Sequence, residues 1–134
     1  TCDAPKSSSS KYLITTHLYF ENTNNGSTFF RMFYNNSGVS SDTSLPDLNL
    51  GISSDQSQIH LGYGHQGGNE HAYALHGSAM TYLWSPGSAL AQTISIKGSS
   101  YSTTGFNINI TSSNSNYNYN ARGISTLTVQ EIAG

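Results

Sequence analysis

The chain has 134 residues and a formal net charge of −2, and only 9% of its residues are charged, against about 25% in an average soluble domain. Five Lys and Arg residues over the whole length are too few for the basic stripe that phosphate binding requires, so nucleic acid is excluded as a partner. No apolar run approaches the roughly 20 residues of a membrane-spanning helix, and membrane insertion is not expected. The hydrophobic share of 35% is sufficient for the core of one domain.

The N-terminal residues 1–10 combine Pro5 with four consecutive serines, a composition that predicts a flexible linker. The single folded domain is then expected to span 11–134. Cys2 lies in the linker and is the only cysteine of the chain. An intrachain disulfide is therefore excluded, and so is a zinc site built on Cys/His spacing.

The first predicted strand is 11–20, where β-branched and aromatic residues dominate. The Asn25-Gly26 step that follows is the strongest short signal for a hairpin, with 28–34 as its second strand. Residues 38–57 are rich in serine and acidic side chains and predict a loop.

The second half of the chain is expected to consist of short strands in which apolar and polar residues alternate. Residues 62–70 contain four glycines in nine positions, which predicts an exposed loop. In the strand after this loop, Gly77 predicts a break. The strands expected here are 57–63, 71–83, 92–97, 106–111 and 126–130.

These elements predict an all-β fold. Strands recur every 10 to 15 residues with turn signals between them, and no window of 11 residues keeps a helical period. This pattern is typical of an antiparallel sandwich or barrel in which each strand buries one face. Repeats at a fixed spacing are absent from the sequence, which makes a propeller or a β-helix a poor fit.

Three stretches together resemble the C-terminal domain of fibre and minor virion proteins of tailed phages, especially marine and cyanobacterial phages. They are 9–14, the segment 80–87 with 93–97, and the closing segment 121–134. The closing segment is the most specific, because it ends in an Arg-Gly-x-Ser-Thr-(apolar)-Thr-(apolar)-x-Glu-(apolar) strand. The resemblance runs from about residue 8 to the C-terminus with order and spacing kept.

The resemblance implies an antiparallel jelly-roll sandwich of the C1q/TNF type that assembles as a homotrimer at the tip of a virion fibre or knob. It implies no catalysis. The implied partners are other virion proteins. Family members usually carry another strand or two upstream of the segment 9–11, so either this chain is a fragment or a neighbour covers the edge that those strands would occupy.

Uncharged polar faces support a trimer independently. Uncharged side chains can hydrogen-bond across a symmetric interface without bringing like charges together on the axis. The residues predicted to lie between subunits are Asn107, Asn109, Thr126, Thr128 and Gln130.

Histidines and carboxylates do not form a recognisable reactive site in the sequence. The five histidines follow no metal-ligand spacing, so no metal and no cofactor is expected; a three-fold site with one His65 from each subunit is the alternative. The seven carboxylates are not paired as glycoside hydrolysis requires, and no serine lies in a Gly-x-Ser-x-Gly elbow. An enzyme is therefore not expected.

Two polar aromatic segments are the candidates for contact with a host glycan. Aromatic rings stack on sugar rings, and neutral donors and acceptors suit sugar hydroxyls. The candidate residues are Tyr63, His65, Gln66, Asn69 and His71 in and beside the glycine-rich segment, and Tyr117 and Tyr119 in a Tyr/Asn run. Both segments can equally be ordinary loops or contacts to another virion protein.

Two other functions remain open at this point. A capsid decoration protein with the same fold would bind the shell through its N-terminal segment and approach the shell protein in copy number. A free C1q-like glycan-binding module would bind sugars outside any virion.

Overall fold

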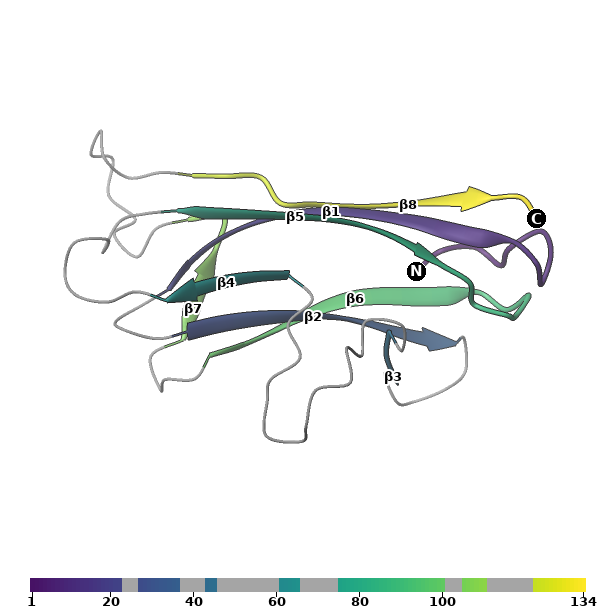
Figure 1. Cartoon of the computed structure of the whole chain (residues 1–134), viewed down its shortest axis with the longest axis horizontal. Coiled ribbons are helices and arrows are strands. Elements are labelled where there is room, and N and C mark those ends of the chain that lie inside the picture. Colours follow the sequence, from purple (N-terminus) through teal and green to yellow (C-terminus); the bar gives the residue numbers. More distant parts are fainter. Residues whose placement is uncertain (23–26, 37–42, 46–60, 66–74, 101–104, 111–121) are drawn as a thin grey trace.

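The computed structural model describes residues 1–22, 27–36, 43–45, 61–65, 75–100, 105–110 and 122–134. Within these ranges the regular structure consists of eight β-strands in two antiparallel sheets, which lie over one another in Figure 1. The all-β, antiparallel fold predicted from the sequence is thereby confirmed. The described segments include no helix long and apolar enough to cross a membrane.

One sheet, called here the β1 sheet, is centred on β1 (Lys11–Asn22). Strand β5 (His76–Trp84) pairs with β1 on one side over almost its whole length. On the other side, β8 (Thr126–Ile132) pairs with the first half of β1, and β7 (Phe106–Ile108) pairs with its end.

The second sheet, the β2 sheet, repeats this plan around β2 (Ser27–Asn36). Strand β6 (Gln92–Ser100) pairs with β2 along one side. The other side is shared by β4 (Leu61–His65) and the short β3 (Thr43–Ser44).

The first two strands do not form the predicted hairpin. Strands β1 and β2 lie in different sheets, and neither pairs with the other. Each carries an apolar face that needs a partner across the sandwich: Ile14 on β1 and Met32 on β2 are both fully buried. Packing these two faces together buries more apolar surface than a two-stranded ribbon would, so tertiary packing overrides the turn signal of Asn25-Gly26.

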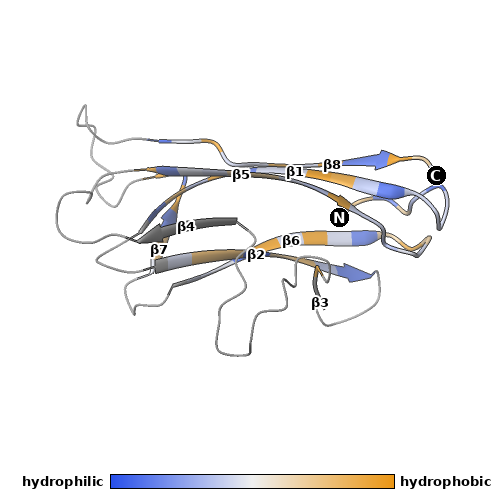
Figure 2. Cartoon of the chain, in the orientation of Figure 1, coloured by the Kyte–Doolittle hydropathy of each residue, from blue (hydrophilic) through white to orange (hydrophobic). Residues whose placement is uncertain are grey.

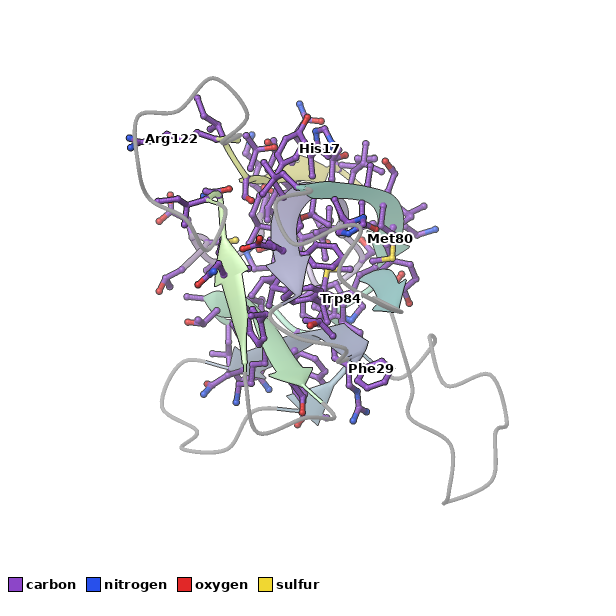
Figure 3. All side chains as sticks on the ribbon, turned by 90° about the vertical axis from the view of Figure 1, so that its left-hand side faces the viewer. His17, Phe29, Met80, Trp84 and Arg122 are labelled. Carbon is purple, nitrogen blue, oxygen red and sulfur yellow. The ribbon has the colours of Figure 1, made fainter. Side chains whose placement is uncertain are left out.

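The core lies between the two sheets and is built largely from aromatic side chains. The rings of Phe20 and Phe30 meet edge to face at 4.9 Å between centroids, and Phe30 meets Phe106 at 5.3 Å. At the other end of the sandwich, Tyr34 packs on Trp84 at 4.7 Å. Figure 2 shows apolar stretches on β1, β2 and β6, and Figure 3 shows Trp84 in the space between the sheets.

Three local expectations from the sequence are wrong. Gly77 does not break its strand, because it pairs with Tyr19 inside β5. The glycine-rich segment does not begin as a loop, since Leu61–His65 forms β4. The strand predicted over 106–111 ends at Ile108, because Asn109 adopts a left-handed conformation with φ of 63°.

Residues 1–10, predicted to be a flexible linker, make contacts with the sandwich in this structure. The amide of Cys2 donates to the Gln92 carbonyl at 2.7 Å, and the Lys6 amide donates to the Glu131 carboxylate at 2.7 Å. Pro5 and Ser10 are buried. These contacts are made mainly by backbone groups, which every sequence carries, so the composition does not indicate them.

Candidate subunit interface

The outer face of the β1 sheet is a broad surface with almost no charge. Between Tyr12 and Phe20 the even-numbered residues of β1 are buried, so the alternate residues of this stretch point away from the core. Figure 3 shows His17 on this outer side. Three outward residues of the central strand, Leu13, Thr15 and His17, define three rows across the sheet.

Each row continues onto the flanking strands. Thr15 lies between Thr81 of β5 and Thr128 of β8. The row of Leu13 includes Leu83 and Gln130, and the row of His17 includes Ala79 and Thr126. All of these flanking residues are exposed, and none of them is an Asp, Glu, Lys or Arg. Lys11, at the first position of β1 opposite Ile132, is exposed, points to the same side and places one cation at the end of this face.

Three of the five residues predicted between subunits lie on this face. Thr126, Thr128 and Gln130 occupy alternate positions along β8, and all three side chains are exposed. Outward positions of edge strands usually carry charges that oppose further association. Here they carry hydroxyl, amide and apolar groups instead. The face is therefore suited chemically to contact with another neutral surface.

The other two predicted interface residues are engaged within the chain. The Asn107 amide donates to the carboxylate of Glu21 at 3.0 Å, and the Glu21 side chain is buried. The Asn109 side-chain oxygen accepts from the amide of Ser125 at 2.9 Å and from its hydroxyl at 2.6 Å. Asn107 thus ties β7 to the end of β1, and Asn109, which follows β7, is tied to the segment that leads into β8.

Asn109 is a structural residue that sequence reasoning did not identify as one. Its backbone amide donates to the carbonyl of Tyr19, and its carbonyl accepts from the amide of Gly123, both at 3.0 Å. Its positive φ is a conformation that Asn tolerates better than most residues. The signal available in the sequence was the Asn itself, in a strand pattern that otherwise continued to Ile110.

Of the residues predicted to contact a glycan, two lie within the described part of the chain. Tyr63 and His65 belong to β4, where the backbone of Tyr63 pairs opposite Phe29 and that of His65 opposite Ser27. The remaining candidates lie outside the described residues: Gln66, Asn69, His71, Tyr117 and Tyr119.

The described residues that flank these candidate segments lie at one end of the sandwich. His65 closes β4 and His76 opens β5 at the end where β1 finishes at Asn22. The bridge between Ile110 and Arg122 lies near the same end, beside β7. Both chain termini lie at the opposite end, as Figure 1 shows.

The outer face of the β2 sheet carries a small basic and aromatic cluster that the sequence did not reveal. Arg31 of β2 and Lys97 of β6 are directly opposite in the register. Their charged groups lie 5.5 Å and 4.9 Å from the centroid of the Phe33 ring. Arg31 and Phe33 are alternate residues of β2, whereas Lys97 is distant from both in sequence. Lys97 joins them because β6 pairs with β2.

A groove of about 510 Å³ lies on the open side of the sandwich, between β6 and β8. Burial raises the pKa of the Cys2 thiol and the pKa of the Tyr12 phenol. The Ser10 hydroxyl and the Lys6 amide favour the charged form of Glu131 and lower the pKa of its carboxyl. The residues around the groove are Thr1, Cys2, Asp3, Ala4, Tyr12, Ile94, Leu127, Val129 and Glu131.

Within the described ranges, no group of three or more His, Cys, Asp or Glu side chains could hold a metal ion together. His17 packs on Tyr19 with 4.5 Å between ring centroids, and His76 packs on Phe20 at 5.8 Å. The two histidines whose side chains the structure describes therefore take part in ring packing. His65 falls on β4, and its side chain is not among those that the structure describes.

Comparison with known proteins gives no relative for this chain. No family model matches it, and neither the curated proteins nor the solved structures include a significant match.

Proposed function

We propose that this protein is a non-enzymatic structural protein of a tailed-phage virion. In this proposal it forms the trimeric distal domain of a fibre or knob and contacts the host surface. The observation that carries the proposal is the neutral outer face of the β1 sheet, together with the resemblance of the closing segment 121–134 to phage fibre domains. Its site of action is the outside of the virion particle.

The path of the chain supports a jelly roll of the C1q/TNF type. A jelly roll winds one chain back and forth between two antiparallel sheets. Here the chain changes sheet after β1, after β4, after β5 and after β6. The strand that closes the chain, β8, lies beside β1 in the same sheet. Both features agree with that winding.

A three-fold assembly suits the chemistry of the β1 sheet face. Around a three-fold axis each residue approaches copies of itself, so charged residues near the axis would repel one another. The rows through Thr15, Leu13 and His17 avoid that cost because their flanking residues are uncharged. Exposed apolar side chains such as Leu83, at 47% exposure, would be buried by the contact, at about 25 cal/mol for each Å² of apolar surface.

The positions of the chain ends support a distal role. The termini lie at one end of the sandwich, and the segments with the candidate glycan residues attach to strand ends at the other (Figure 1). Attachment to a fibre near the N-terminus would direct Tyr63, His65 and the neighbouring candidates away from the virion. A host cell-surface glycan is the proposed ligand there.

The oligomeric state tests this proposal. We expect the wild-type protein to have a mass near three times 14.4 kDa by light scattering coupled to gel filtration. Thr128→Lys places a charge in the centre of the neutral face and should shift the mass toward that of the monomer. The matched control is Ser99→Lys, an exposed strand position on the β2 sheet, which should leave the trimer intact. A monomeric wild-type protein, or a trimer that tolerates Thr128→Lys, would contradict the proposed interface.

The packing of the N-terminal segment argues against the capsid decoration alternative. That function requires residues 1–10 to reach the shell, whereas Cys2 and Lys6 here bond to β6 and β8. The number of copies in each particle separates the two functions. A few trimers per particle fit a fibre tip, and a number close to that of the shell protein would instead identify a decoration protein. Glycan binding by the isolated protein without any virion partner would favour the third alternative, a free C1q-like module.

A further inference from the structure

The groove between β6 and β8 lies along two sheet edges. Strand β6 is the edge of the β2 sheet, and β8 flanks β1 at the edge of the other sheet. Ile94 contributes to the groove from one sheet, and Leu127 and Val129 contribute from the other. Leu127 is 41% exposed although it points toward the interior side of β8. The sandwich is therefore open to solvent at this side.

The edge of β6 already carries the beginning of another strand. Cys2 pairs antiparallel with Gln92, donating to its carbonyl at 2.7 Å and accepting from its amide at 3.3 Å. Backbone groups of alternate residues in a strand point to the same side. The amide and carbonyl groups of Ile94 and Ile96 consequently point away from β2, in the same direction as those of Gln92. Among the described residues, Cys2 is the backbone partner of β6 on this side, and the hydroxyls of Thr1 and Thr93 lie 3.2 Å apart.

We propose that this groove is a strand-acceptor site for one extended segment of a partner polypeptide. The added strand would run antiparallel to β6 and would continue the ladder from the Cys2–Gln92 bridge along Ile94 and Ile96. In this direction the C-terminal end of the added strand would lie next to Thr1. The inference rests on the geometry of the two edges and does not depend on the assignment to a virion.

The chemistry of the groove defines the strand that it would take. Alternate side chains of the strand would enter the space between Ile94 and Leu127, which favours apolar residues there, and the others would face solvent. The Glu131 carboxylate at the groove already accepts a hydrogen bond from the backbone amide of Lys6. An uncharged strand with β-branched apolar residues at every second position fits best.

The groove favours a single strand over a second folded copy. The groove is bounded by both sheets, so an occupant must fit between the two edges. A second copy would approach as a complete sandwich of two sheets, whereas a single strand has no second sheet to accommodate. All eight strands of the described chain are also paired within the fold, so a second copy would have to release one before donating it. Paired edges between two copies remain a measurable outcome of the test below.

The test uses the complete protein and a capped synthetic peptide of alternating Thr and Val as the probe. Binding should slow the amide hydrogen exchange of Ile94 and Ile96 by roughly tenfold at saturating peptide, because both amides would gain a ladder hydrogen bond. The exchange of Ser95, whose amide points toward β2, should change much less. The matched control peptide carries N-methyl groups at the valines, which removes the donors on that edge and should abolish the effect.

Three outcomes would overturn the proposal. They are unchanged exchange at Ile94 and Ile96 with the free peptide, equal effects of the two peptides, and protection that depends on the concentration of the protein alone. The last would indicate edge pairing between two copies. Fusing the same peptide directly to Thr1 gives a further check: protection by the fused peptide with none by the free one would assign the groove to a segment of the same chain and not to a partner. The mass measured by light scattering reports the trimer separately, so either proposal can fail alone.

Discussion

The β1 sheet and the β2 sheet share one plan, with a long central strand flanked by a nine-residue strand on one side and by two shorter strands on the other. Their outer faces differ. Arg31 and Lys97 lie directly opposite each other on the β2 sheet, both near the Phe33 ring. The outward rows of the β1 sheet carry threonine, alanine, leucine, histidine and glutamine. The same architecture thus presents one charged face and one neutral face.

This difference shows how side-chain chemistry can separate the roles of two similar sheets. Like charges directly opposite each other across a strand pair destabilise it, and a cation over an aromatic ring recovers about 0.5–1 kcal/mol at exposed sites. A face with this arrangement repels a copy of itself. The neutral face has no such penalty, which makes it the one of the two that can meet its own copies around an axis.

The largest expected effect tests whether the two sheets depend equally on one core. Ile14 of β1 and Met32 of β2 are both fully buried, so Ile14→Ala and Met32→Ala should each lower the free energy of unfolding by about 2–5 kcal/mol. Urea denaturation at one fixed protein concentration measures both. Similar losses in a single transition indicate one cooperative core. Two separate transitions, or a loss confined to one variant, would show that the sheets unfold independently.

Much of the fold could be predicted from the sequence, because the strands carry their own period-two signal. The predicted strands 11–20, 28–34, 92–97 and 126–130 all fall within β1, β2, β6 and β8. Strand partners could not be predicted in the same way. The turn signal at Asn25-Gly26 is local, whereas the choice of sheet depends on which apolar faces meet across the core.

The predicted interface residues show the same difference between local patterns and contacts distant in sequence. The exposure of Thr126, Thr128 and Gln130 on β8 could be predicted, because a strand that alternates polar and apolar residues places every second side chain on one face. Asn107 and Asn109 follow the same pattern in sequence, yet they bond to Glu21 and Ser125. Those partners come from distant parts of the chain, so nothing local in the sequence indicates them.

Alanine substitutions at two glycines should change stability by smaller amounts. The two losses should differ, because Gly98 lies on the inner side of the β2 sheet and Gly77 lies on the outer side of the β1 sheet. A Cβ on Gly98 of β6 would overlap the Phe106 ring and lie 2.8 Å from Cε1 of Phe30. Gly98→Ala should therefore cost about 1–3 kcal/mol of stability through overpacking. A Cβ on Gly77 of β5 would lie 3.2 Å from Cε1 of Tyr19, and Gly77→Ala should stay within about 1 kcal/mol of the wild type. Equal losses in thermal denaturation would contradict this difference.

The smallest expected effect concerns how the N-terminal segment is held to each sheet. It bonds to the β2 sheet through the backbone of Cys2 and to the β1 sheet through the Glu131 carboxylate. The Ser10 hydroxyl and the Lys6 amide lower the pKa of Glu131 from its usual value near 4.5. A lowered pKa in the folded state stabilises the protein above the unfolded pKa, and this contribution is lost as the pH falls through the folded value.

Acid should therefore loosen the contact with β8 before the contact with β6. We expect the hydrogen-exchange protection of the Lys6 amide to fall below about pH 4.5, while that of the Cys2 and Gln92 amides persists. Glu131→Gln should lower the protection of Lys6 at neutral pH and remove most of its dependence on pH. The bridge to Gln92 contains no titrating group, so its protection should be the same in the variant. Loss of protection at Lys6 and Cys2 together, at the same pH, would mean that the segment leaves both sheets as one unit.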